Sequence, residues 1–236
     1  MTNYSVKISP RARQVSLKIT PSEGLVVVVP RGFNHDLLDD IVASRSTWIE
    51  KVFSRYDELP GCLDDVAMPE QIELIALGEV WLLEYIQTSS DSVRVIQAEP
   101  GRLRVMGKLG DQRATCKALR RWLMRHAKEK LLICLEQASQ ECGLSFTKAT
   151  IRGQRSRWGS CSSTGAINLN YQLLFVSPAM MHYVLLHELC HTVHLNHSAG
   201  FYHLLESHIA NYRDIESQLK QAWRSMPAWL YRLQAT

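Results

Sequence analysis

The segment VLLHELCHTVHLNHSAGFYHLLE, which runs from Val184 to Glu206, holds five of the nine histidines of the chain. Its first half is otherwise apolar, a composition typical of a buried helix. Ser177 and Pro178 precede it and are favoured residues for the N-cap and the first position of a helix. Burying an imidazole or a carboxylate costs several kcal/mol unless the group is paired or bound to a metal. The chain is therefore constrained to a fold that surrounds this helix and gives its polar side chains a partner.

His187, Glu188 and His191 form the pattern H-E-x-x-H. Residues four apart on a helix share a face, so both imidazoles can bind one ion while Glu188 reaches a water molecule on it. Zinc suits this set, because imidazole nitrogens at about 2.0 to 2.1 Å fill three corners of a tetrahedron and leave the fourth to water. The alternative is a chance match on a helix that buries its histidines for structural reasons. The apolar flanks favour the metal site, because they would otherwise bury an unpaired Glu188.

A third protein ligand is needed, and His194 lies too far along the helix to supply it. A straight helix rises by about 10.5 Å between His187 and His194, too far for both to reach a single ion. We expect the helix to stop near Leu195 and the chain to turn back at Asn196, a residue that tolerates the left-handed conformation. This turn would present His197 and complete the longer pattern H-E-x-x-H-x5-H.

Two other side chains compete for the third position. Glu206 lies 15 residues past His191, and a carboxylate on a following helix fills this role in some zinc peptidases. The second competitor is His203, although we expect His194 and His203 to support the site or lie on the surface. The predicted ligands of one zinc ion per chain are therefore His187, His191 and His197.

Composition places the chain among ordinary globular proteins. Its 236 residues, 46% of them hydrophobic, are enough to bury a sizeable core. A net charge of +4 is far from the dense basic stripe of a dedicated nucleic-acid binder, so nucleic acid is not established as a partner. The start, MTNYSVKISPRARQ, does not match a signal peptide, and no apolar run reaches roughly 18 residues, so we expect a cytoplasmic protein that does not enter a membrane. The six cysteines form no Cys-x-x-Cys pair, which favours reduced thiols.

Apolar periodicity divides the chain into strands and helices. Strand patterns occur in residues 4–29, and an amphipathic helix follows over 37–53 with Asn34 as its N-cap. A long helix is predicted over 111–141, ending at Gly143. Further strands are predicted at 72–87, 92–98, 102–107, 145–151, 155–161 and 166–172, the last two joined as a hairpin. We therefore predict an α+β fold with an N-terminal β-rich region, containing one helix, at 1–108 and a second domain at 109–236.

The long predicted helix has a basic face, composed of Lys117, Arg120, Arg121, Arg125 and Lys128. Runs of like charge on a helix are usually solvated surfaces, and this is the interpretation that we favour. A functional basic groove is the alternative.

The runs IRGQRSRWGSCSSTGAINLNYQLLFVSP and VLLHELCHTVHLNHSAGFYHLLE resemble the YgjP-like family of metallopeptidase-type proteins, also called the domain of unknown function 45 family. The motifs RWGSCS, INLN, HELCH and NHSxxF carry the resemblance over about residues 151–206 and are specific when taken together. Tyr202 stands where many relatives have Trp, which leaves the ligand pattern intact. The resemblance implies a zincin-like domain with a small antiparallel sheet, a supporting helix and an H-E-x-x-H helix. The ligand spacing is also similar to that of the WLM and SprT-like peptidases, some of which act on proteins crosslinked to DNA.

The favoured function is a zinc metallopeptidase with a peptide or protein as substrate. Zinc would lower the pKa of its water towards about 7, and Glu188 would take the proton and pass it to the leaving amine. The predicted strand at 155–161 would pair with an extended peptide, with Trp158 as a side wall, although a core position for Trp158 is the favoured interpretation. Candidate contacts to the substrate or the oxyanion are Arg152, Arg155, Arg157, Tyr202 and His194.

Two other functions compete with the peptidase. The three arginines would grip a phosphate chain in a nucleoside triphosphate pyrophosphohydrolase, whose partner is a nucleotide. Phosphoanhydride hydrolysis usually prefers oxygen-rich magnesium sites, however, whereas three histidines favour zinc. A non-catalytic metal-binding module is disfavoured because Glu188 has no duty as a ligand. We therefore expect a metal-dependent hydrolase, with cleavage of peptide bonds ahead of cleavage of phosphoanhydrides.

Overall fold

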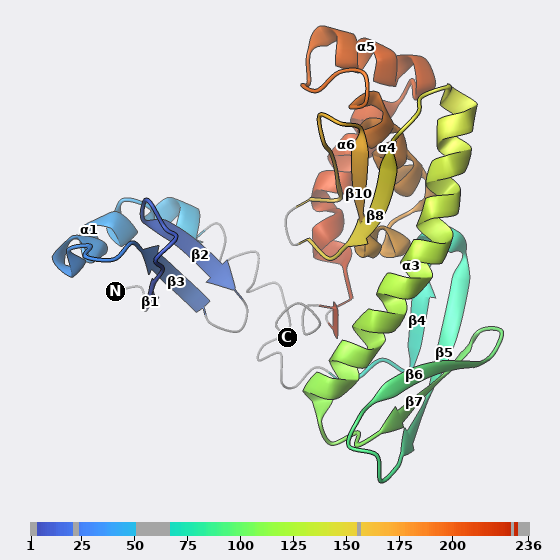
Figure 1. Ribbon diagram of the computed structural model, residues 1–236, viewed down its shortest axis with the longest axis horizontal. Helices are drawn as coiled ribbons and strands as arrows, with labels where there is room; N and C mark the ends of the chain where they lie inside the picture. The colour runs from blue at the N-terminus through green and yellow to red at the C-terminus, as the bar shows by residue number, and fades with distance from the viewer. Residues whose placement is uncertain (1–3, 21–23, 51–66, 155–156, 228, 231–236) are drawn as a thin grey trace. The chain divides into compact units, whose positions relative to one another are not determined.

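The computed structural model describes residues 4–20, 24–50, 67–154, 157–227 and 229–230. Two compact units make up the chain, one containing residues 1–68 and 227–235, and the other containing Pro69–Met226. No helix in the described part of the chain is both long enough and apolar enough to cross a membrane. The mixture of small sheets and helices confirms the predicted α+β class (Figure 1).

The first unit is a three-stranded sheet with a helix on one face. Its strands are β1 (Tyr4–Ile8), β2 (Ser16–Thr20) and β3 (Gly24–Val29), with β3 in the centre, parallel to β1 and antiparallel to β2. The 3-10 helix η1 (His35–Leu37) leads into α1 (Leu38–Ala43), and the Asn34 side chain accepts a hydrogen bond from the backbone N–H of Asp36 as predicted for an N-cap. The predicted helix over 37–53 is interrupted by a turn at 44–45 and continues over 46–50, while 51–53 lie outside the described residues. One face of β3 buries Leu25, Val27 and Val29 against Leu38, Val42 and Ile49.

The second unit begins with a four-stranded sheet. Its strands are β4 (Gln71–Leu74), β5 (Glu79–Gln87), β6 (Arg94–Glu99) and β7 (Arg102–Gly107), in the order β4-β5-β7-β6. The single strand predicted over 72–87 is wrong, because the 3-10 helix η3 (Ile75–Leu77) and Gly78 reverse the chain between β4 and β5. Gly78 has a φ of 64°, a conformation that glycine adopts without steric cost. The residues on both sides of this turn, 74–77 and 80–83, are all apolar, which hid the turn in the sequence.

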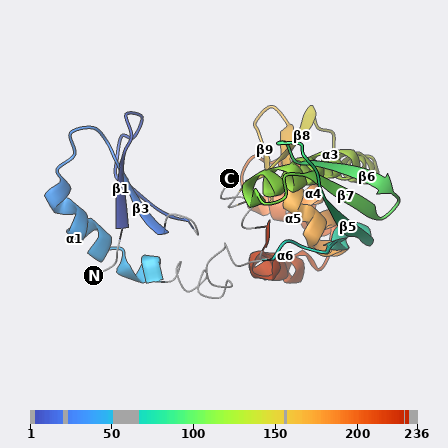
Figure 2. The same cartoon turned by 90° about the horizontal axis from the view of Figure 1, so that it is seen from below.

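A long helix, α3 (Gln112–Cys142), lies beside this sheet, and Figure 2 shows the same arrangement from below. The Asp111 side chain accepts a hydrogen bond from the N–H of Ala114 and caps its start, while Gly143, with a φ of 69°, ends it. These features confirm the helix predicted over 111–141. Its apolar stripe is fully buried, with Leu119, Leu123, Leu131 and Leu135 at 0% exposure.

A second small sheet follows, composed of β8 (Lys148–Arg152), β9 (Gly159–Cys161) and β10 (Ala166–Asn170) in the order β8-β10-β9. The predicted hairpin is confirmed, since β9 and β10 pair antiparallel across a turn at Gly165. The expectation of a purely antiparallel sheet is wrong, because β8 pairs parallel to β10. A hairpin is a local feature that turn residues reveal, whereas a parallel pair joins distant segments and leaves no local pattern.

The remaining elements are helical and surround the histidine-rich segment. They are η4 (Tyr171–Phe175), α4 (Pro178–Cys190), α5 (Ala199–His208), α6 (Tyr212–Gln221) and η5 (Ala222–Ser225). The helix α4 packs against α3, α5, α6 and β9, which makes it the centre of this part of the unit (Figure 1).

The boundary between the compact units lies after residue 68 and does not coincide with the predicted border after residue 108. The four-stranded sheet belongs to the same unit as α3 because the two share one core. Sequence patterns locate strands but do not say which core they join. As a division by function, the border at residue 108 stays a prediction.

A partly buried polar cluster joins α3 to the four-stranded sheet. The Glu79 carboxylate contacts His126 Nε2 at 2.6 Å, accepts a hydrogen bond from Trp81 Nε1 at 2.9 Å and lies 3.2 Å from Lys130 Nζ. The His126 ring stacks on Trp122 at 5.1 Å between centroids. Burial alone would raise the pKa of Glu79, but the hydrogen bonds from Trp81 and His126 and the positive charges of His126 and Lys130 outweigh it and lower the pKa.

We predict that Glu79 stabilises the fold fully above its ordinary pKa of 4.5 and that this contribution is lost as the pH falls from there through its lowered pKa. A carboxyl group with a lowered pKa in the folded state stabilises the fold while it is ionised. This stabilisation is lost as the pH falls from the ordinary pKa of the unfolded state through the lowered pKa of the folded state. Replacing Glu79 by Gln should therefore make the free energy of unfolding in urea less dependent on pH between about pH 5 and pH 3. Glu84→Gln, which removes an exposed carboxylate from β5, is the matched control. Equal pH dependence in the wild type and Glu79→Gln would contradict this assignment.

Candidate metal centre

The helix α4 begins and ends with features that set the position of its histidines. The Ser177 side chain accepts a hydrogen bond from the N–H of Met180, and Pro178 occupies the first turn, as predicted. The regular helix ends at Cys190, so the expectation that it continues to near Leu195 is wrong. One tight turn follows, closed by a hydrogen bond from the N–H of His194 to the carbonyl of Cys190.

The turn that returns the chain to the site differs from the expected one. Asn196 does not have a positive φ, so the chain reverses without a left-handed residue. Ser198 then caps α5 through a hydrogen bond from the N–H of Phe201, as predicted for the helix that follows His197. The tight turn after Cys190 already redirects the chain, which makes a left-handed residue unnecessary.

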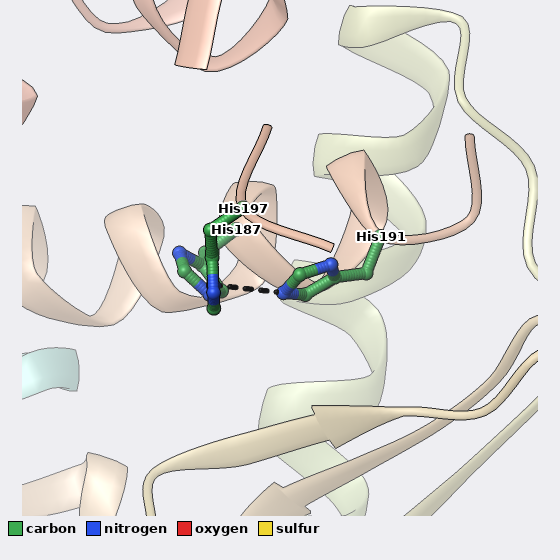
Figure 3. A group of neighbouring side chains, drawn as sticks. All are labelled: His187, His191 and His197. Carbon is green, nitrogen blue, oxygen red and sulfur yellow. Dashed lines mark hydrogen bonds between the residues drawn. The ribbon is translucent and has the colours of Figure 1, made fainter. Parts of the chain in front are cut away.

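Three imidazoles converge at the end of α4 (Figure 3). The Nε2 atom of His197 lies 3.1 Å from Nε2 of His187 and 3.2 Å from Nε2 of His191. Each of the three offers one ring nitrogen, and these atoms lie within 4.8 Å of one another. Two nitrogens bound to a tetrahedral zinc at about 2.05 Å would be separated by about 3.3 Å. The spacing of the histidines therefore fits a zinc ion.

The other ring nitrogens of two histidines have partners that fix the ring orientations. His191 Nδ1 lies 2.8 Å from the backbone carbonyl oxygen of His194, which can only accept, so this nitrogen carries the proton and Nε2 is free to bind a metal. His187 Nδ1 lies 3.4 Å from the hydroxyl of Tyr183, a buried residue one turn earlier on α4. His194 thus supports the site through its backbone carbonyl, in agreement with a supporting role.

Phe201 forms the apolar wall against which all three imidazoles pack. Its ring centroid lies 5.0 Å from that of His187, 4.5 Å from that of His191 and 4.9 Å from that of His197. The side chain is fully buried, so it holds the rings together without competing for a ligand position. Sequence analysis assigned no role to Phe201 or Tyr183. The only signal for Phe201 was its place in the motif NHSxxF.

The two competitors for the third position lie apart from this group. Neither Glu206 nor His203 belongs to the described cluster of ligand atoms, and both are exposed. Glu206 lies near Arg213. The pKa of Arg213 is raised mainly by its hydrogen bond to Tyr212 and the charge of Tyr212, and to a smaller extent by the charge of Glu206.

Glu188 is buried beside the histidines, with 5% of its surface exposed. Burial raises the pKa of its carboxyl group to about 8, against the opposing effect of the positive charge of Arg157. The Oε2 atom is buried and has no hydrogen-bond partner among the described residues. An isolated buried acceptor is costly, so this atom is suited to a water molecule or another polar group at the site.

Gly159, the first residue of β9, lets Glu188 take this position. A Cβ atom at Gly159 would lie 2.5 Å from Glu188 Oε1 and 2.7 Å from its Cγ atom. The backbone of β9 and the Glu188 carboxyl group are therefore in direct contact, and only glycine permits it. This contact gives the glycine of the motif RWGSCS a physical reason.

The predicted substrate contacts differ in their exposure and in their distance from the histidines. Arg152 and Arg157 are exposed, and Arg152 Nε donates a hydrogen bond of 3.4 Å to Asn168 Oδ1. Arg155 lies outside the described residues. Trp158 is buried and stacks on Trp223 at 3.8 Å between centroids, which favours the core interpretation over a side wall for substrate. The ring of Tyr202 lies 6.1 Å from that of His197, at the edge of the histidine cluster.

A family model for the YgjP-like metallopeptidase domain matches residues 13–222. The chain belongs to this YgjP-like family. Membership confirms the predicted class, a metal-dependent hydrolase of metallopeptidase type. In this YgjP-like chain the matched region includes most of the first unit, from residue 13 on, as well as the three histidines, so the family pattern extends beyond the motifs quoted from residues 151–206.

Two solved structures are similar to parts of the YgjP-like chain. One is the metallopeptidase zymogen abylysin of Pyrococcus abyssi, with 24% identity and a TM-score of 0.36 over 39% of this chain and 93% of that chain. The other is the metallopeptidase zymogen jannalysin of Methanocaldococcus jannaschii, with 20% identity and a TM-score of 0.36 over 40% of this chain and 97% of that chain. No curated protein matches the chain.

We predict that Gly159→Ala lowers hydrolytic activity by about 100-fold or more, because the new methyl group displaces the Glu188 carboxyl group by a distance that catalysis does not tolerate. The metal content should stay unchanged, since the atoms nearest to the added methyl group belong to Glu188 and not to the three histidines. Activity and zinc content of the purified variant are the measurements. Gly110→Ala adds the same methyl group where no atom lies within 4 Å and is the control. Full activity of Gly159→Ala would show that the contact with Glu188 is unimportant.

Proposed function

We propose that this chain is a zinc-dependent peptidase with a zincin-like catalytic site. In this proposal His187, His191 and His197 bind one zinc ion through their Nε2 atoms, and Glu188 is the general base. The observation that carries it is the convergence of three Nε2 atoms at zinc spacing beside a buried carboxyl group with an unpartnered oxygen.

The proposed chemistry assigns a separate task to each part of the site. A bound zinc ion supplies Lewis acidity, which polarises a carbonyl group and lowers the pKa of water. Glu188 takes a proton from the attacking water at its carboxylate and gives it to the nitrogen of the leaving amine. A base works best when its pKa lies near the pH of the reaction, and burial raises the pKa of Glu188 to about 8. The hydrophobic surroundings thus prepare this carboxyl group for proton transfer.

The strand β9 supports a peptide as the substrate. Within the described residues β9 pairs with β10 alone, so its other edge has free backbone groups that an extended peptide can use. Its contact with Glu188 through Gly159 would bring a peptide on that edge next to the base. Arg157, which is close enough to lower the pKa of Glu188, and Tyr202 are the proposed oxyanion or substrate contacts.

A nucleotide substrate is the second candidate, and the position of Arg157 favours it. An exposed guanidinium near the metal centre and Glu188 suits a phosphate chain as well as an oxyanion. The ligand set still favours the peptidase, because three imidazoles select zinc over the magnesium that phosphoanhydride chemistry usually uses. A cytoplasmic location stays a prediction.

The decisive comparison is between the zinc-loaded wild type and Glu188→Gln. Glutamine is nearly isosteric but cannot accept the proton, so we expect this variant to keep zinc and fold while it loses cleavage of unstructured polypeptides by more than about 100-fold. Zinc content is measured beside activity, and nucleoside triphosphates are tested in parallel.

Three results would contradict the peptidase. Release of pyrophosphate that both Glu188→Gln and Arg157→Ala abolish, with polypeptides uncut, would promote the nucleotide reaction. Loss of zinc from Glu188→Gln would make Glu188 a structural residue. Zinc binding without hydrolysis of either substrate would indicate a non-catalytic metal-binding module.

A further inference from the structure

The helix α3 carries a row of four exposed cations that winds slowly around its surface, by about 40° from one cation to the next. Arg113, Lys117, Arg121 and Arg125 follow one another at intervals of four residues and are all exposed. At about 1.5 Å of rise per residue, neighbouring cations are about 6 Å apart and the row is about 18 Å long. We call these four residues the basic ridge.

The stability of the helix does not explain this charge pattern. The segment from Gln112 to Lys128 contains six Lys and Arg residues and no Asp or Glu. Like charges four residues apart destabilise a helix, and the helix dipole favours acidic residues in the first turn, where α3 has none. Such an arrangement breaks two local rules at once, which points to a use outside the helix.

No neighbour within the chain neutralises the basic ridge. None of its four cations forms an ion pair with another described residue. Arg121 donates a hydrogen bond of 3.0 Å to the carbonyl of Val93, which holds its guanidinium in place without removing the charge. The acidic residues that flank the row are Asp111, whose side chain caps the helix, and Glu129, one turn beyond Arg125.

We propose that the basic ridge binds the phosphate backbone of double-stranded DNA. Duplex DNA carries one negative charge per about 1.7 Å of its axis, so a ridge of about 18 Å runs along about ten charges. The ridge lies on one uninterrupted helix of 31 residues, so its four charges are held in a fixed, extended array. Contacts to phosphates alone carry no base specificity, so binding is independent of DNA sequence.

An anionic membrane is a poorer partner for this surface. Helices that lie on membranes insert large apolar side chains beside their cations. The exposed large apolar residue of α3 is Ile133, which lies about two turns beyond Arg125 and outside the ridge. The ridge therefore offers charge without an apolar anchor, which suits phosphates in water.

The test measures binding of the zinc-loaded, full-length chain to a fluorescent duplex of about 20 base pairs by anisotropy at several salt concentrations. Each phosphate contact contributes about −0.9 to the slope of log K, the association constant, plotted against log salt concentration. Four contacts therefore predict a slope of about −3.6. Binding should thus weaken by roughly 100-fold between about 50 and 200 mM salt. Replacing all four ridge residues by Gln should reduce the slope to near zero and affinity at about 50 mM salt by at least about 10-fold.

A matched control removes the same number of charges elsewhere. In this control variant four exposed cations of the first unit are replaced by Gln, namely Lys7, Arg13, Lys18 and Arg31. This variant should keep the wild-type slope and affinity within about twofold if the ridge is the binding surface. Circular dichroism and thermal melting of both variants check that the fold is kept.

Four outcomes would overturn the proposal. The first is the absence of binding to the duplex at about 50 mM salt, and the second is a ridge variant with the affinity and salt slope of the wild type. The third is a loss of DNA affinity in the control variant equal to the loss in the ridge variant. The fourth is ridge-dependent binding to vesicles of phosphatidylserine and phosphatidylcholine in the absence of DNA binding, which would assign the ridge to a membrane surface.

Discussion

The close approach of three imidazoles at the end of α4 is the constraint on which the rest of the site depends. Burial, and then the charges of His191 and His197, lower the pKa of His187 to about 3. Burial also lowers the pKa of His191. The neutral ring is the form that binds a metal, so the lowered pKa values of His187 and His191 favour the form that the proposed site needs. Packing of α4 against α3, α5 and α6, with Phe201 behind the rings, supplies the rigidity that this arrangement needs.

The proposed catalytic role of Glu188 depends on a second close contact, between this side chain and the backbone of β9. Because Gly159 has no side chain, the carboxyl group reaches the strand directly and is shielded from water. The same contact ties the base to the sheet edge proposed for the peptide. The strand β9 would thus set the position of both the proposed base, Glu188, and the proposed peptide substrate. A single element that positions both groups favours a constant geometry between them.

Local signals were enough to predict some elements and not others. Asp111 and Gly143 mark the ends of α3 because caps act within one turn of a helix, and Ser177 marks the start of α4 for the same reason. The turn at Gly78 was missed because consecutive apolar residues stand on both sides of it, 74–77 before and 80–83 after. Three features could not be predicted because they depend on contacts between separate segments of the chain. They are the parallel pairing of β8, the unit to which the four-stranded sheet belongs, and the packing of Phe201 behind the histidines. The histidine pattern itself was readable, because helical spacing and zinc geometry impose it on the sequence.

The most direct test of the account is X-ray absorption spectroscopy of the zinc-loaded protein at the zinc edge. The account predicts three imidazole nitrogens at about 2.0 to 2.1 Å, one further light atom, and no sulfur at about 2.3 Å. The spectrum of His197→Ala should lose one imidazole, while that of Glu206→Ala should stay unchanged. Two imidazoles in the wild type, a sulfur ligand, or an unchanged spectrum for His197→Ala would contradict the site described for this chain.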